Sequence, residues 1–205
     1  MESLTFKDTQ RLHQSIQKLY TLRNLDTFGV DALLILNQLV PGDFINVHST
    51  CIETRQILST FLPDCPGYTS EMERVIHRHF YEHPIAQRMP QALSGVNKIS
   101  DFISQQELYC LEGLYQQFLR LFDFKDQMVF FLPNANLDSS YKFTQMNASL
   151  LGFSFHRSQP NFTERDRLVL DLLRPHLFQA YCNAQHSQQL QQNLSQLQQS
   201  LNPLD

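Results

Sequence analysis

The stretch DFINVHSTCIETRQILSTFL, from Asp43 to Leu62, decides the fold class. Its two halves, residues 43–53 and 56–62, are rich in β-branched and aromatic residues, and the polar letters ETR lie where they join. Two such runs separated by a short polar segment are typical of a β-hairpin. We therefore expect an antiparallel sheet that includes this hairpin.

Helical patterns flank the hairpin on both sides. Apolar residues recur every three or four positions, as in Leu12, Ile16 and Leu19. The same spacing predicts helices over residues 4–25, 29–40, 70–80 and 104–122. Within the last of these, Cys110 lies in an apolar stretch and is expected to be a core residue rather than a nucleophile.

Two further strands are expected after these helices. The runs DQMVFFLP (126–133) and SLLGFSFHR (149–157) are almost continuously apolar and are bounded by turn residues, which is typical of buried strands. KISDFIS (98–104) predicts a short strand that runs into a turn, and residues 134–148 form a segment long enough to hold a strand of its own. This order of elements predicts an α+β fold with one antiparallel sheet flanked by helices.

A long helix is expected from residue 163 onward. In FTERDRLVLDLLRPHLFQAYCNAQ (162–185), Thr163 is a suitable N-cap and Asp166 follows three residues later. The expected inward face consists of Leu168, Val169, Leu172, Leu173 and Leu177. Pro175 removes one backbone hydrogen bond, so it predicts a kink and is our candidate hinge.

The end of this helix is rich in glutamine, with leucines as its only large apolar residues. Leu190, Leu194, Leu197, Leu201 and Leu204 alternate by four and three positions, as in the seam of a coiled coil. With Leu173 and Leu177, the leucines at 190, 194, 197 and 201 are the candidate dimerisation residues, and a homodimer is expected. We assign residues 1–160 to a sensor domain and residues 161–205 to a signalling helix with a short coiled-coil connector.

This seam is short for a stable coiled coil. Burying one leucine stabilises by roughly 1.5–3 kcal/mol, whereas bringing two chains together costs on the order of 4–15 kcal/mol. A dimer therefore also uses the globular part, or the coil continues in a longer parent chain. The alternative is that the tail packs back on its own domain or is frayed.

Composition excludes several functional classes. The net charge is −4, and the 16 Lys and Arg residues are scattered, so direct nucleic-acid binding by this chain is not expected. The first residues contain no apolar signal segment, and the longest apolar run is too short for a bilayer, so we expect a cytoplasmic protein without a membrane span. The four cysteines are widely spaced and should be free thiols.

Catalytic and metal-binding motifs are sparse. His79 and His83 are four residues apart, a spacing that on one helix face can present two imidazoles to a metal, but no third ligand is evident nearby. A partly solvated helix face is the simpler interpretation, and we expect no metal. The sequence holds neither a GxSxG motif nor a phosphate-binding glycine loop. We therefore do not expect an enzyme.

A ligand pocket is a better-supported prediction than a reaction. A sheet covered by helices and rich in Phe and Tyr can enclose an apolar cavity with a few polar groups. The candidate wall residues are Tyr81, His83, Phe102, Tyr109 and Tyr115. The alternative for each of them is that it simply fills the core.

Three stretches resemble a known family. Residues 98–104, 114–133 and 162–184 resemble the N-terminal, GAF-like sensory region of bacterial LuxR/NarL-type transcriptional regulators, and the matches span most of residues 30–185. The third stretch is the most specific, because FTERDR followed by LLRPHL and AY is similar to the ending of the family's sensor domain. The glutamine- and leucine-rich tail is similar to the connector of cyanobacterial-looking members.

The resemblance implies a GAF/PAS-like sheet, a terminal signalling helix and a C-terminal helix-turn-helix that binds DNA as a dimer. No helix-turn-helix is present up to Asp205, so we expect either an excised sensor domain or a stand-alone form. The acyl-homoserine-lactone branch uses tryptophans and an Asp-Pro pair. This chain has no Trp and carries His83-Pro84 instead, so that ligand is not expected. No Cys-His pair that could attach a bilin is present, and we expect no cofactor.

These observations predict a regulatory sensor domain. A small ligand or a regulatory protein would change the core, and the long helix would relay that change to a dimer partner. The alternative is a ligand-free module for protein–protein interaction or dimerisation.

Overall fold

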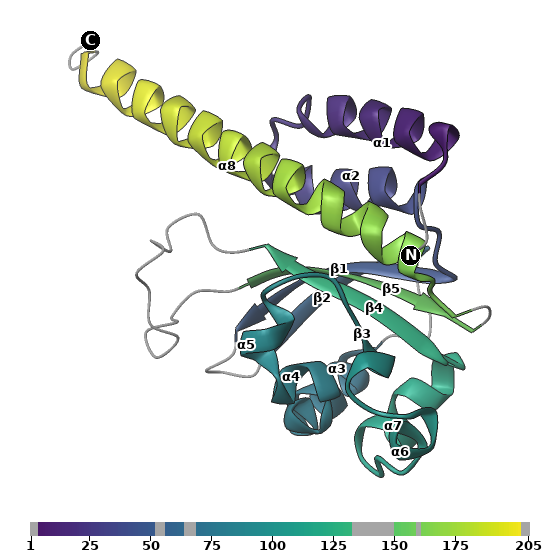
Figure 1. The fold of residues 1–205 in the computed structure, drawn as a ribbon. Helices are drawn as coiled ribbons and strands as arrows, with labels where there is room; N and C mark the ends of the chain where they lie inside the picture. The colour runs from purple at the N-terminus through teal and green to yellow at the C-terminus, as the bar shows by residue number, and fades with distance from the viewer. Residues whose placement is uncertain (1–3, 52–55, 64–68, 133–149, 159–160, 202–205) are drawn as a thin grey trace.

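The computed structural model describes residues 4–51, 56–63, 69–132, 150–158 and 161–201. Figure 1 shows three layers: α1, α2 and α8 lie above a central sheet, and α3 to α7 lie below it. We call these the upper and lower helical layers.

Within the described residues, the sheet has five antiparallel strands in the order β2-β1-β5-β4-β3. The strands are β1 (Phe44–Cys51), β2 (Gln56–Leu62), β3 (Asn97–Lys98), β4 (Asp126–Leu132) and β5 (Leu150–Arg157). The expected hairpin is present as β1 and β2, and the apolar runs at 126–133 and 149–157 form β4 and β5. The last strand in sequence therefore lies between the first strand and β4.

The upper layer consists of α1 (Phe6–Leu19), α2 (Leu25–Asn37) and the long α8 (Glu164–Leu201). Successive residues of a strand point to opposite faces, so one apolar set faces this layer. That set includes Ile45, Val47, Phe130, Phe153 and Phe155, which join buried residues of all three helices in one core.

The lower layer consists of short helices: α3 (Ser70–Arg78), α4 (Pro84–Gln87), α5 (Met89–Ala92), α6 (Gln105–Tyr109) and α7 (Leu114–Gln117). Three 3₁₀ turns lie among them, at Phe80–Glu82, Ile99–Asp101 and Leu119–Phe122. A second core, with Val75, Ile85, Leu108, Leu114 and Phe131, lies between these helices and the sheet. The sheet is thus covered on both faces, and the predicted α+β class, an antiparallel sheet flanked by helices, is confirmed.

The prediction of one helix over residues 104–122 is wrong. The chain forms α6, then α7, then a 3₁₀ turn, because a helix that ends at Cys110 restarts after Gly113. A carboxylate oxygen of Glu82 accepts the Leu114 N–H at 2.8 Å, so a side chain from another element satisfies the start of α7. Cys110 is exposed at the break and is not the core residue that we expected.

The start of α8 is fixed as the sequence predicts. The Asp166 N–H donates to Thr163 Oγ1 at 3.1 Å, and the Thr163 N–H donates to a carboxylate oxygen of Asp166 at 3.1 Å. Arg157, at the end of β5, donates to the same carboxylate at 3.0 Å. Arg165 also pairs with Asp8 of α1. These contacts tie the start of α8 to the sheet and to the N-terminal helix.

The helix then continues through Pro175 as one element. Val169, Leu173 and Leu177 face the core as expected, whereas Leu168 and Leu172 are 36% and 42% exposed and do not. No observation tests the expected kink, so Pro175 stays our candidate hinge.

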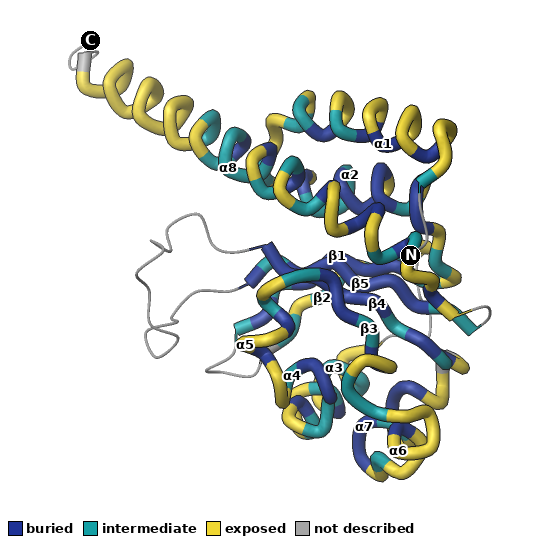
Figure 2. The backbone as a smooth tube through the Cα atoms, in the orientation of Figure 1, coloured by how far each residue is buried: buried dark blue, intermediate teal, exposed yellow. Residues whose placement is uncertain are grey.

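The end of α8 projects away from the body (Figure 1) and is exposed from Gln189 to Ser200 (Figure 2). Leu190, Leu194 and Leu197 are 58–63% exposed, and the side chain of Leu201 is outside the described part. Leu173 and Leu177, by contrast, are completely buried in the core of their own chain. Of the described helices, none combines the length and the apolar character that a bilayer span requires.

Candidate ligand-binding site

The lower face of the sheet carries a row of polar side chains. On β1, Asn46, His48 and Thr50 alternate with the apolar residues of the upper face. Strand pairing sets Asn46 opposite Ser154 of β5, and His48 opposite Ser59 of β2. On a solvated sheet such residues would face water, but here the lower helical layer covers them. A buried polar face of this kind must find its hydrogen-bond partners inside the protein or in a ligand.

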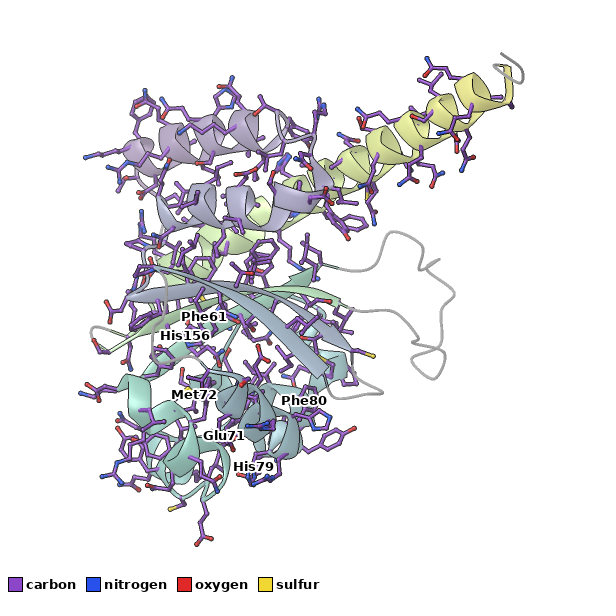
Figure 3. The ribbon with its side chains drawn as sticks, turned by 180° about the vertical axis from the view of Figure 1, so that it is seen from behind. Phe61, Glu71, Met72, His79, Phe80 and His156 are labelled. Carbon is purple, nitrogen blue, oxygen red and sulfur yellow. The ribbon has the colours of Figure 1, made fainter. Side chains whose placement is uncertain are left out.

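A cavity of about 100 Å³ lies between this face and the lower helical layer. Its polar lining residues are Asn46, His48, Thr50, Ser59, His83, Gln127, Ser154 and His156. Its apolar walls come from both the sheet and the lower layer, and include Phe61, Ile76, Phe80, Ile85, Met89, Phe118 and Phe131. Figure 3 shows Phe61 and His156 on the sheet side of this space, with Phe80 below them. The cavity is therefore apolar below and polar along the sheet.

Asn46 connects three of these side chains. Its Oδ1 accepts a hydrogen bond from His156 Nε2 at 3.0 Å. Its Nδ2 donates to His48 Nδ1 at 3.3 Å and approaches Ser59 Oγ at 3.5 Å. This orientation of the amide assigns the proton of His156 to Nε2 and that of His48 to Nε2.

His83 joins the same cavity from the lower layer. Its Nδ1 accepts from the Ile85 N–H at 3.3 Å at the start of α4, so its proton is on Nε2, which donates to Gln127 Oε1 at 3.0 Å. The imidazole therefore links the first turn of α4 to the central part of the sheet.

Gly152 makes room for His48. A Cβ atom at this position would lie 2.2 Å from His48 Nε2, which is closer than non-bonded atoms approach. The ring of His48 also meets that of Phe131 edge to face, with centroids 5.7 Å apart. Glycine at this position of β5 is thus what allows the imidazole to lie over the strand.

The three cavity histidines are held neutral. Burial lowers the pKa of His48 to about 4, that of His83 to about 4 and that of His156 to about 3. Mutual repulsion of the imidazolium forms adds to the effect for His48 and His156. At neutral pH the lining therefore offers hydrogen bonds but no positive charge from these rings.

Among the described residues that line the cavity, two buried polar atoms lack a hydrogen-bond partner, namely His156 Nδ1 and Thr50 Oγ1. Both side chains are at most 4% exposed. Because an unsatisfied buried polar group costs about 1–3 kcal/mol, such atoms in a native protein need an explanation. A ligand that satisfies at least one of them would be such an explanation.

One of the five predicted pocket residues lines the cavity. His83 lines the cavity, and Tyr81, Phe102, Tyr109 and Tyr115 are not in its lining. Tyr81 and Tyr109 are exposed, the rings of Tyr109 and Tyr115 lie 4.8 Å apart in contact with each other, and Phe102 lies beside Arg88. The role of these five residues in ligand binding stays a prediction.

Sequence reasoning missed the residues of the sheet. The signal that could have found them is the alternation of Asn46, His48 and Thr50 with apolar residues in a strand that we expected to be flanked by helices. The same alternation continues at Ser154 and His156.

The suggested pairing of His79 and His83 on one helix does not occur. His79 ends α3 and His83 caps the start of α4, so the two side chains are not on one helix face. His79 Nδ1 pairs with Glu82 Oε1 at 2.6 Å, whereas His83 contacts Gln127. Within the described residues, no group of three or more His, Cys, Asp or Glu side chains could hold a metal ion.

The cavity is linked to α8 by polar contacts. Arg174 donates from Nε to the Phe131 carbonyl at 3.1 Å, and from its two terminal nitrogens to the carbonyls of Ser94 at 3.1 Å and Leu93 at 2.6 Å. A carboxylate oxygen of Asp171 accepts the Val96 N–H at 2.9 Å. The segment at 93–96 directly follows α5, whose Met89 lines the cavity.

Comparison with known proteins shows which fold this is. No family model matches the sequence, and no curated protein does. The structure is similar to the LBD domain of VqsR from Pseudomonas aeruginosa, with 18% identity, a TM-score of 0.58, and coverage of 85% of this chain and 96% of that one.

Two other solved structures give the same picture. SdiA from Escherichia coli matches with 12% identity and a TM-score of 0.55, covering 86% of this chain and 68% of that one. The phycoerythrobilin-bound GAF domain of a cyanobacterial phytochrome matches with 10% identity and a TM-score of 0.53, covering 91% of this chain and all of that domain, 100%. At identities this low the likeness shows the fold alone. The chain has a GAF-like fold, with a long helix added at its C-terminal end.

Proposed function

We propose that this chain is the sensor domain of a transcription regulator, that it binds a small molecule in the cavity, and that α8 relays the bound state to a second copy. The observation that carries the proposal is the buried polar row on the lower sheet face, with two unpartnered atoms beside a cavity. An apolar core of the same shape would be more stable without these groups, so their presence favours a ligand.

The contacts of Arg174 and Asp171 support a relay. A ligand shifts an equilibrium only through contacts that differ between two arrangements. Movement of α5 or β4 around a ligand would change the carbonyl positions that Arg174 holds, and α8 would respond. In this proposal residues 1–160 sense and residues 161–205 transmit, although the first turns of α8 also belong to the core of the body.

The exposed leucines support dimerisation through the tail. Leu173 and Leu194 are 21 residues apart (194 − 173), which is three heptads, so the seam continues the stripe that is buried in the first half of the helix. In the first half that stripe packs on α1, α2 and the sheet, and in the second half it is solvent-exposed. A second copy is the partner that such a stripe fits.

The second candidate is a ligand-free dimerisation module, which the same exposed leucines favour. Native mass spectrometry of freshly purified full-length chain separates the two. If the cavity holds a ligand, the monomer or dimer should be heavier than the mass calculated from its chains, and this excess mass should be lost on denaturation. The variant Ala86→Leu, which adds volume to the cavity wall, should lose that extra mass. A dimer without excess mass, for both the parent chain and the Ala86→Leu variant, would favour the second candidate.

A further inference from the structure

We infer that the cavity takes a small, uncharged molecule of about the size of one ring, which donates an N–H or O–H hydrogen bond to His156 Nδ1. This inference rests on the proposed ligand-binding function and specifies the chemistry of that ligand.

The size follows from the volume. The cavity measures about 100 Å³, and an engineered apolar cavity of about 150 Å³ in another protein binds benzene. A molecule larger than one ring with a substituent would need the lower helical layer to move. Side chains such as Phe80, Ile85 and Met89 give this ring apolar walls.

The absence of charge follows from the lining. Among the described residues that line the cavity there is no Asp, Glu, Lys or Arg. The only ionisable rings are His48, His83 and His156, and all three are neutral at neutral pH because they are buried. Each unit between the pKa and the pH costs a factor of ten, so protonating His48 or His83 at pH 7 to meet an anion would weaken binding by about a thousandfold, and protonating His156 by about ten-thousandfold. An anion or a cation in this cavity would therefore have no opposite charge beside it, so an uncharged ligand is favoured.

The donor follows from the tautomer of His156. Its Nε2 already donates to Asn46 Oδ1 at 3.0 Å, so Nδ1 carries a lone pair and no proton. The ring of Phe124 stacks on that imidazole with centroids 4.3 Å apart, which fixes its orientation. Nδ1 is buried without a partner, so only a group that brings its own hydrogen can satisfy it.

Thr50 provides a matched control within the same cavity. It too is buried with an unpartnered atom, but it lies four residues along β1 from Asn46, to which the imidazole of His156 is hydrogen-bonded. Four residues of a strand span roughly 13 Å. One ring-sized molecule cannot reach both atoms, so Thr50 should not contribute to the contact with His156.

The test compares three probes of one ring size on the full-length protein at neutral pH: phenol, toluene and benzoate. Calorimetry or chemical-shift titration should show phenol binding about tenfold more tightly than toluene, the ratio that one hydrogen bond of about 1.4 kcal/mol gives. Benzoate should show no binding. Thr50→Val should keep the affinity for phenol, and His156→Phe, which preserves the stacked ring, should reduce it to that for toluene.

Equal affinities for toluene and phenol would overturn the inference that the ligand donates a hydrogen bond. Tighter binding of benzoate than of phenol would overturn the inference that the ligand is uncharged. Either result would still be consistent with a ligand-binding cavity. Loss of phenol binding in Thr50→Val with retention in His156→Phe would also overturn the inference. If His156→Phe does not fold, the phenol and toluene affinities of the unmodified protein decide. Failure of all three probes would reject the inference, and the native mass spectrum would then judge the proposed function separately.

Discussion

Arg174 Nε of α8 donates a hydrogen bond of 3.1 Å to the carbonyl oxygen of Phe131, whose ring lines the cavity from β4. The same guanidinium holds the carbonyls of Leu93 and Ser94, after α5. Burial lowers the pKa of Arg174, although nearby Asp171 opposes that shift. A single side chain therefore joins α8 to two elements that meet the cavity wall.

Arg174→Lys should disrupt this junction, because one ammonium nitrogen cannot replace the three nitrogens of a planar guanidinium that donate to three separate carbonyls. We expect a loss of about 1–3 kcal/mol in the free energy of unfolding, the usual effect of removing hydrogen bonds to a charged donor. Urea denaturation measures it. Arg120→Lys is the matched control, because Arg120 is exposed and its side chain donates a hydrogen bond to Gln116 Oε1 at 3.1 Å. Equal losses for the two variants would contradict the role of Arg174.

Stability should fall with acid in a definite window. A histidine with a lower pKa in the folded protein than in the unfolded chain takes up a proton on unfolding, so acid favours the unfolded state between the two values. For His48 and His83 the window runs from 6.5 down to about 4, and for His156 from 6.5 down to about 3. Each histidine should lower the free energy of unfolding by up to about 1.4 kcal/mol per pH unit in this range.

Denaturant titrations at a series of pH values above the range in which carboxylates titrate would measure this slope. Above pH 6.5, the pKa of a histidine in the unfolded chain, the contribution of the neutral histidines to the free energy of unfolding should be complete. His156→Asn should reduce the slope by about one proton. A slope that does not change in this variant would show that His156 is not buried and neutral.

Gly152→Ala should be strongly destabilising. The added Cβ would lie 2.2 Å from His48 Nε2, so the imidazole must leave its place or the strands must separate. We expect a cost of about 1–3 kcal/mol, typical of overpacking. Gly95→Ala is the control, because the nearest atom to its new Cβ is Asp171 Oδ1 at 3.4 Å, an ordinary contact. Thermal melts of the two variants give the comparison, and equal melting temperatures would be the contrary result.

The exposed leucines should control association. Replacing Leu190 and Leu197 by Ser removes apolar area from the seam, at roughly 1.5–3 kcal/mol for each buried leucine. We expect the dimer dissociation constant to rise by at least about tenfold in sedimentation equilibrium. A variant with Ser at Gln192 and Gln199, seven residues apart on the opposite side of the heptad, should associate as the parent does. Unchanged association of the leucine variant would exclude the tail as the interface.

Pro175→Ala tests the hinge. Alanine restores the backbone donor that proline lacks, so the helix should become stiffer with little change in the stability of the body. The distribution of distances between a spin label on α1 and one on the end of α8 should be narrower in this variant than in the parent protein. A distribution as broad as that of the parent would exclude Pro175 as the hinge.

The layers of the fold could be predicted from the sequence because their signals are local. Alternation and apolar runs predicted β1, β2, β4 and β5, and the capping pair Thr163 and Asp166 predicted the start of α8. The helix expected over residues 104–122 was wrong, since periodicity does not register the break at Gly113 that Glu82 satisfies from a distance. The proposed extra strand at 134–148 lies outside the described residues.

The candidate site was harder to predict, because strand pairing creates it. His156 and Asn46 are 110 residues apart in sequence, yet they share a hydrogen bond. A search for aromatic residues on helices favoured Tyr81, Tyr109 and Tyr115, which the structure places at or near the surface. Of the five predicted wall residues, His83 lines the cavity.

The strand order has a consequence for how the chain reaches this structure. β5 lies between β1 and β4, so until residues 150–157 are in place both of its neighbours present unpaired backbone edges. In a nascent or truncated chain that stops before Leu150, β1 with β2 and β3 with β4 would be two separate parts of the sheet, and the side of the cavity that β5 forms would be missing. Such a fragment should be prone to edge-to-edge aggregation, and completion of the sheet must await the synthesis of residues 150–157.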